Sequence, residues 1–213
     1  MILIAAVCAV SYLLGSIPFG LLYSRARGID IRNVGSKNIG ATNVSRQFGF
    51  ISGFLPVFLL DMAKGAIPVY MAGTFIHTLI GRDGIMVLAG ISAIIGHMFP
   101  IYLSFKGGKG VATGLGAFIL IAPYEMAVCI LVFILTLSLA RYFEPSRKSN
   151  PFFKDLQKGV GLSSCIAALI FPVSAFLIEP SRKLILIISI PVVLLLIYQH
   201  RSNLIKIFKG ERS

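Results

Sequence analysis

The sequence predicts an all-α integral membrane protein with seven transmembrane helices, folded as a single membrane-embedded domain over residues 1–213. Hydropathy, segment length and the placement of charge support this prediction. The mean hydropathy is +0.88 and 56% of the residues are hydrophobic. A chain of 213 residues then has no room for a sizeable soluble domain beside several spans of about 20 residues each.

The first three expected helices follow the apolar segments in order. The first covers about residues 1–24 and has no basic segment before it, so we expect a retained span rather than a cleaved signal peptide. The second runs from about 51 to 76, and the third from about 84 to 104. The basic 25–50 segment lies between the first two spans. By the positive-inside rule, this segment is cytoplasmic and the amino terminus is outside.

The apolar stretch from 111 to 140 admits one long helix or two shorter ones. Pro123 interrupts it, and a single crossing would place the basic segment that follows on the outer side, against the charge bias. Two crossings, about 111–122 and 124–141, keep that segment in the cytoplasm. We therefore expect two helices here, the first of them unusually short.

Two last helices, about 160–178 and 184–199, flank an outer turn and return the carboxyl terminus to the cytoplasm. The polar 143–158 segment is then an inner loop. On this topology most lysines and arginines face inward. The net charge of +12 suits anionic lipid headgroups and a phosphorylated substrate. Nucleic acid is not expected, because the basic residues lie between apolar segments rather than along one soluble face.

Two polar, glycine-bearing segments interrupt the apolar sequence: residues 35–43, the first island, and residues 105–110, the second island. Glycines let backbone N–H groups approach an oxyanion, hydroxyls and amides add neutral donors, and lysines supply compact charge. The expected topology brings both islands to the inner membrane face. This combination is typical of a phosphate site.

Two more polar stretches, residues 161–164 and 200–203, are expected at the same face. Any one of the four stretches alone would more often only end a helix, but four together favour a pocket for a polar substrate. Asp61 and Lys64, three residues apart in the second span, are expected to neutralise each other rather than to catalyse. For His97 two roles are equally expected: a hydrogen bond at the end of its helix, or a place in the site.

Six motifs in one order resemble the bacterial acyl-phosphate-dependent glycerol-3-phosphate acyltransferases, the PlsY family, over nearly the whole chain. They are LGSIPFG at 14–20, NVGSKNIGATN at 33–43, DMAKG at 61–65, GHMFP at 96–100, FKGGKGVAT at 105–113 and HRSN at 200–203. The resemblance implies an enzyme of the bacterial cytoplasmic (inner) membrane with its active site on the cytoplasmic face. It would transfer a fatty acyl group from acyl phosphate to the 1-hydroxyl of sn-glycerol 3-phosphate. The products would be lysophosphatidic acid and inorganic phosphate, in phospholipid synthesis.

The resemblance also implies roles for single residues. Ser36, Arg46 and Lys109 match the phosphate-site positions of the family. The catalytic residues implied are Ser36, Lys109 and His200. The substrate-binding residues implied are Asn38, Thr42, Asn43, Arg46, His97, Lys106, Gly107, Gly108, Gly110, Ser164 and Asn203. The Ser-Leu-x-Ser pattern of the family is altered here, so Ser163 stays an alternative to Ser164.

The implied chemistry suits these residue types. Acyl phosphate is already activated, so the protein needs mainly to position two phosphorylated substrates and to stabilise charge on the carbonyl oxygen and the departing phosphate. Neither a G-x-S-x-G elbow nor an H-x-x-x-x-D pair is present, and we expect no cofactor and no metal ion. The hydroxyl proton passes either to His200 or to the phosphate of the donor, and the sequence leaves both routes open.

Two other classes of function compete with this enzyme. A membrane carrier for a phosphorylated metabolite should place its site near the midplane with access to both faces, whereas these motifs are expected at the inner boundary. A lipid-binding scaffold would not need ordered Ser, Asn and Gly motifs. The expected partners are acyl phosphate, glycerol 3-phosphate and membrane lipid.

Overall fold

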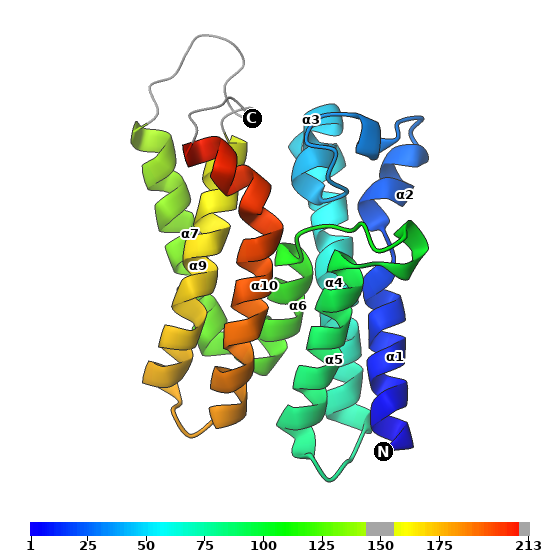
Figure 1. Cartoon of the computed structure of the whole chain (residues 1–213), viewed down its shortest axis with the longest axis vertical. Coiled ribbons are helices and arrows are strands. Elements are labelled where there is room, and N and C mark those ends of the chain that lie inside the picture. The colour runs from blue at the N-terminus through cyan, green and yellow to red at the C-terminus, as the bar shows by residue number, and fades with distance from the viewer. Residues whose placement is uncertain (144–155, 209–213) are drawn as a thin grey trace. The chain divides into compact units, whose positions relative to one another are not determined.

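The computed structural model describes residues 1–143 and 156–208, and this part of the chain is helical without a β-strand. The chain divides into two compact units, residues 1–123 and 124–213 (Figure 1). The helices long and apolar enough to cross a membrane are Ile2–Arg25, Ala41–Phe75, Gly81–Leu103, Pro123–Tyr142, Gly159–Ile178 and Lys183–Ile205. The shorter apolar helix Val111–Ile121 lies where the sequence predicts the short fourth span. The all-α prediction is confirmed, and the count of seven crossings stays a prediction.

The first unit contains nine helical elements. They are α1 (Ile2–Ser16), α2 (Phe19–Arg25), η1 (Ile31–Asn33), α3 (Ala41–Gly49), the π-helix η2 (Phe50–Phe54), α4 (Leu55–Phe75), α5 (Gly81–Met98), η3 (Ile101–Leu103) and α6 (Val111–Ile121). The first predicted span is therefore two helices. Pro18 has no N–H group and disfavours helical geometry at Ile17, which is extended with φ −60° and ψ 118°.

Glycines let the long helices of the first unit pack closely. A Cβ atom on Gly15 of α1 would overlap the backbone of Ala93 in α5. A Cβ atom on Gly116 of α6 would likewise overlap the carbonyl group of Met62 in α4. Small residues at such crossings allow backbone-to-backbone contact, which is how helices commonly associate inside a membrane. α4 and α5 are thus held against α6 and α1, respectively.

An apolar cluster gathers the segments around both islands at one end of the first unit. Its buried members are Leu21, Ile31, Ile39, Ala41, Val44 and Val57. Leu103, two residues before the second island, packs against it. Because Ile39 belongs to the first island, the cluster brings the neighbourhoods of the two islands to the same end of this unit (Figure 1).

The second unit contains α7 (Pro123–Phe143), which starts at the boundary proline, α9 (Leu156–Ile178) and α10 (Lys183–Phe208). α9 and α10 form a hairpin through a turn at residues 179–182. The hairpin packs closely near one end, where a Cβ atom on Gly161 would lie 2.8 Å from Nδ2 of Asn203. The inner loop predicted at 143–158 falls mostly outside the described residues.

Candidate functional site

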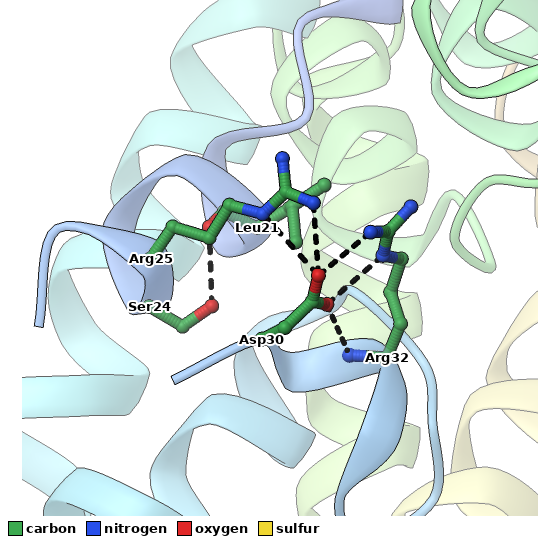
Figure 2. Close-up of polar contacts among 5 residues, drawn as sticks. All are labelled: Leu21, Ser24, Arg25, Asp30 and Arg32. Carbon is green, nitrogen blue, oxygen red and sulfur yellow. Dashed lines mark hydrogen bonds and ion pairs between the residues drawn. The ribbon is translucent and has the colours of Figure 1, made fainter. Parts of the chain in front are cut away.

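Ion pairs of Asp30 with Arg25 and Arg32 fix the turn that leads into the first island (Figure 2). The Asp30 carboxylate accepts hydrogen bonds from Arg25 Nη2 at 2.9 Å and from Arg32 Nη2 at 2.6 Å. It also accepts the backbone N–H of Arg32 at 3.1 Å, which caps η1. The hydrogen bonds from Arg32 and then from Arg25 hold the pKa of Asp30 well below its usual range.

Asn43 organises the backbone of the first island. Its side chain is buried, with 1% of its surface exposed. The Nδ2 group donates to the carbonyls of Ile31 at 3.1 Å, Val34 at 3.0 Å and Asn38 at 2.9 Å. Its Oδ1 atom accepts the backbone N–H of Ser36 at 2.9 Å. Asn43 thus fixes the shape of the island from within, and its polar atoms are directed at the protein backbone.

Ser36 and Arg46 flank the same glycine of the first island, Gly35, along the chain and in space, respectively. Ser36 is exposed, and its backbone is held by Asn43. Gly35 adopts φ +58°, and a Cβ atom there would lie 3.2 Å from Nη1 of Arg46. The Nε atom of Arg46 is buried and has no hydrogen-bond partner within the described part of the chain. A buried donor of this kind is rare and indicates a missing acceptor.

The start of α3 completes the first island. Asn38 Oδ1 accepts the backbone N–H of Gly40 at 3.0 Å, and Thr42 contributes its carbonyl to the Ser45 hydroxyl at 2.8 Å. α3 begins after Gly40 without a side-chain cap. The N–H groups of an uncapped first turn, together with the helix dipole, favour a bound anion.

The second island makes a similar entry into α6, but two of its glycines are already hydrogen-bonded. The N–H of Gly107 donates to the Met98 carbonyl at 3.1 Å, and the N–H of Gly108 donates to the His97 carbonyl at 3.0 Å. Both amides therefore face the protein. The expectation that these two amides face an oxyanion is therefore wrong in this structure, because both are bound to carbonyls of the protein. The absence of side chains at Gly107 and Gly108 instead allows the loop to approach His97 closely.

The two lysines of the second island lie just before the start of α6. Lys106 is exposed and Lys109 is partly buried. Gly110 adopts φ +81°, which favours glycine, and precedes α6 without a side-chain cap. The island can therefore offer an anion a lysine charge and the first amides of a helix.

Backbone strain occurs in the two islands and at the residue directly before the second one. Among the described residues, the non-glycine residues with positive φ are Lys37 at 59°, Ser104 at 50° and Phe105 at 63°. Side chains make this left-handed region unfavourable, above all for a bulky residue such as phenylalanine. Strained residues of this kind cluster at ligand-binding and catalytic sites. The positions of these three residues therefore favour a functional role for both islands.

His97 lies beneath the second island rather than at the surface. Its side chain is 4% exposed, and its Nδ1 atom lies 3.1 Å from the hydroxyl of Thr113 and 3.7 Å from Asp61 Oδ1. Sequence reasoning did not find these neighbours, because Asp61, His97 and Thr113 belong to three different helices and no spacing along the chain reveals their contact.

The second unit carries the other predicted residues on α9 and α10. The Ser164 hydroxyl donates to the carbonyl of Val160 at 2.7 Å, and Ser163 is buried beside it. His200 is 2% exposed. Its Nδ1 atom lies 2.9 Å from the Leu196 carbonyl, which can only accept, so Nδ1 is the donor of this hydrogen bond.

Comparisons with known proteins agree over nearly the whole chain. The family model for glycerol-3-phosphate acyltransferase matches residues 5–210. A glycerol-3-phosphate acyltransferase of Desulfotalea psychrophila is 40% identical over 201 residues, covering 94% of this chain and 92% of that protein. The enzyme of that name from Trichlorobacter lovleyi is 37% identical over 205 residues, covering 96% of this chain and 94% of that protein.

Two solved structures are similar as well. The crystal structure of PlsY (YgiH), described as an integral membrane glycerol 3-phosphate acyltransferase and solved in its glycerol 3-phosphate form, has a TM-score of 0.82 at 33% identity. The match covers 99% of this chain and 94% of that chain. The lysophosphatidic acid form has a TM-score of 0.79 at 31% identity, with the same coverage. These similarities and the apolar helices confirm the prediction of a multi-pass membrane protein.

Proposed function

The chain belongs to the glycerol-3-phosphate acyltransferase family, and we propose that it transfers a fatty acyl group from acyl phosphate to the 1-hydroxyl of sn-glycerol 3-phosphate. Membership of this family supports glycerol 3-phosphate as the molecule that is acylated. The similarity to PlsY supports acyl phosphate as the donor. The products are lysophosphatidic acid and inorganic phosphate.

The single observation that carries the site is the buried Nε atom of Arg46, which has no hydrogen-bond partner among the described residues and whose side chain lies beside Gly35, the residue before Ser36. An arginine presents a planar fork of donors that matches phosphate oxygens in pairs. A phosphate placed there meets the guanidinium group, the Ser36 hydroxyl and the first turn of α3. We therefore assign phosphate recognition at the first island to Ser36 and Arg46, with Asn38, Thr42 and Asn43 supporting them.

Lys109 provides the second charge. Both phosphorylated substrates are anionic, and the departing phosphate gains charge as its bond to the acyl carbon breaks. A cation and helix amides at the start of α6 would stabilise that charge where it develops. We assign this role to Lys109 and the first turn after Gly110, with Lys106 as an outer cation.

The reaction needs no covalent intermediate on the protein. The 1-hydroxyl oxygen of glycerol 3-phosphate attacks the acyl carbonyl carbon, a new ester bond forms, and the bond between that carbon and the phosphate oxygen breaks. The hydroxyl proton passes to the departing phosphate or to Nε2 of His200. We favour the phosphate as acceptor. Ser164, His200 and Asn203 are then expected to orient substrate.

The expected topology belongs to the same proposal. Seven crossings, with the amino terminus outside and the carboxyl terminus in the cytoplasm, expose both islands to the cytoplasm, where we expect the phosphorylated substrates. The short apolar helix Val111–Ile121 is then the fourth crossing. The membrane is the bacterial cytoplasmic membrane, and lipid surrounds the apolar helices.

The direct test is to incubate the purified protein with glycerol 3-phosphate and either acyl phosphate or acyl-CoA, each with and without excess chelator. We expect lysophosphatidic acid with acyl phosphate in both conditions and none with acyl-CoA. Strict dependence on acyl-CoA would disprove the donor assignment, and loss of product in chelator would disprove the metal-free route. A protein that binds glycerol 3-phosphate but forms no product with any donor would instead support a carrier.

A further inference from the structure

A buried charge pair in α4 has no part in the proposed chemistry. Lys64 Nζ lies 2.9 Å from Asp61 Oδ1, and the two side chains are 3% and 4% exposed. Taking two charges out of water is costly, and a well-packed apolar pair of similar volume often gives equal or greater stability. Mutual neutralisation therefore accounts for how the pair is tolerated but not for why it is present.

Both members of the pair have a second contact on another element. Lys64 Nζ donates to the carbonyl of Ile17 at 2.7 Å, in the break between α1 and α2. Asp61 Oδ1 lies 3.7 Å from His97 Nδ1, and the same ring atom lies 3.1 Å from the Thr113 hydroxyl in the first turn of α6. The pair thus joins the end of α1 to α4, α5 and the start of α6.

His97 in turn holds the second island from two sides. Its carbonyl accepts the N–H of Gly108 at 3.0 Å. A Cβ atom on Gly108 would overlap Nε2 of the ring, so the opposite edge of the imidazole is packed directly against this glycine. Lys109 is the next residue. The orientation of the His97 ring therefore bears on where the backbone of Lys109 lies.

We propose that Asp61 is a positioning residue for the acyl transfer. With its charge balanced by Lys64, it fixes the His97 ring together with Thr113, and the ring fixes Gly108 and the backbone that carries Lys109. The inference rests on the proposed function, because its effect on the rate requires that Lys109 serves the reaction. Its effect on the second island does not depend on that function.

The first experiment separates positioning from neutralisation. Asp61→Leu leaves the Lys64 charge buried without its carboxylate and should lower the thermal unfolding temperature. In the double variant Asp61→Leu/Lys64→Gln no charge is stranded, and glutamine retains a donor for Ile17. We expect the double variant to regain at least half of the lost unfolding temperature. Its kcat/KM should stay at least 10-fold below that of the wild type, because misplaced groups lose catalysis steeply. Recovery of kcat/KM to within twofold would overturn the proposal.

The second experiment measures how accessible the second island is to a labelling reagent and does not depend on enzyme activity. In a background without native cysteines, Lys106→Cys reports the maleimide labelling rate of the second island, and Gln47→Cys, exposed on α3, is the matched control. We expect Asp61→Leu/Lys64→Gln to raise the rate at position 106 at least threefold and to leave position 47 unchanged. Equal changes at both positions, or no change at either, would contradict positioning.

A milder variant covers the case in which the double variant does not fold. Thr113→Val removes one hydroxyl from His97, keeps the side-chain shape and strands no charge. We expect faster labelling at position 106, a several-fold lower kcat/KM and an unfolding temperature close to that of the wild type. Unchanged labelling and kcat/KM would count against the network. If the wild type forms no lysophosphatidic acid, the proposed function fails, while the labelling comparison still decides whether the network holds the island.

Discussion

At the scale of single residues, the first island is a hydrogen-bonded scaffold that leaves a buried donor unused. Asn43 directs its side-chain donors and its acceptor at the island backbone. Arg46, by contrast, keeps a buried Nε atom without a partner in the described part of the chain. This difference indicates that Arg46, rather than Asn43, binds a ligand.

Replacing Arg46 tests this reading. Arg46→Met removes the charge and the planar donors, while Arg46→Lys keeps the charge and loses the fork. A charged hydrogen bond contributes about 1.5–3 kcal/mol, which corresponds to roughly a 10- to 150-fold change in kcat/KM. We expect a loss of that size for Arg46→Met and a smaller one for Arg46→Lys. Gln47→Met, the exposed neighbour on α3, is the control. Near-wild-type kcat/KM in folded Arg46→Met would contradict the assignment.

His200→Gln distinguishes orientation from base catalysis. Glutamine preserves part of the hydrogen bonding of the imidazole, so turnover should remain measurable at saturating glycerol 3-phosphate if the donor phosphate takes the proton. Single-turnover product formation and substrate binding are the quantities to measure. Complete loss of the chemical step with intact binding would make His200 the base.

Asp30 predicts a specific pH dependence of stability. Its pKa is lowered in the folded protein, mainly by Arg32, so its contribution is present above the ordinary carboxyl pKa of about 3.9. That contribution declines as the pH falls toward the lower folded pKa. The unfolding temperature of Asp30→Asn should therefore lie below that of the wild type at pH 6, and the gap should narrow toward pH 3. If the difference in unfolding temperature between the two proteins stays constant or widens toward pH 3, the stabilising role of the Asp30 ion pairs is contradicted.

Which residues of the site carry chemistry stays a prediction from the sequence, and the directions in which their atoms point could not be predicted from it. The first island was predicted as a phosphate site, and Arg46 does lie beside its first residue, Gly35. The inward amides of Gly107 and Gly108, the scaffold role of Asn43 and the contact of Asp61 with His97 depend on helices that are distant in sequence. Motif spacing alone therefore cannot separate a residue that touches substrate from one that shapes the loop.

At the scale of elements, α4 is braced by close helix contacts at glycines. Gly65 of α4 and Gly116 of α6 have no space for a Cβ atom against the opposing backbone, at Thr113 and Met62 respectively. This close contact also places the first turn of α6 against α4, where Thr113 reaches His97. Helix packing and the second island are therefore coupled.

Two glycines of α6 form a matched test of this packing. Gly116→Ala places a Cβ atom against the Met62 carbonyl, whereas at Gly114 the nearest atom would be 3.8 Å away. Overpacking costs about 1–3 kcal/mol, so Gly116→Ala should lower the unfolding temperature by roughly 2–12 °C. Gly114→Ala should leave it unchanged or slightly higher, since alanine favours helix by about 1 kcal/mol. Equal effects in the two variants would contradict the close contact.

Element boundaries were predictable where one strong local signal acts. Pro123 correctly separates α6 from α7, and the apolar runs predict the long helices. The break at Pro18 carried a similar signal, but the apolar run continues across it and concealed the start of α2. α3 lies inside the polar 25–50 segment, where hydropathy gives no sign of a helix, and the π-helix Phe50–Phe54 has no simple sequence signature.

At the scale of the whole molecule, hydropathy and charge predict the membrane class and an orientation. The class is confirmed by the apolar helices and by the relatives. The orientation stays a prediction that rests on the positive-inside rule. It therefore requires labelling in cells.

Single cysteines test the orientation in a background without native cysteines. A cysteine replacing Asp83, in the first turn of α5, should react with a membrane-impermeant maleimide added outside intact cells. A cysteine replacing Ser149, which lies outside the described residues, should react only after the membrane is opened. Strong external labelling at position 149 would overturn the seven-crossing topology.

The stoichiometry of the reaction tests the central claim most directly. Purified wild-type protein is mixed with acyl phosphate, with and without glycerol 3-phosphate, and lysophosphatidic acid and inorganic phosphate are measured together over time. Direct acyl transfer predicts that the two products form in equal amounts and only when glycerol 3-phosphate is present. Phosphate release without lysophosphatidic acid, or no product from acyl phosphate at all, would contradict the account.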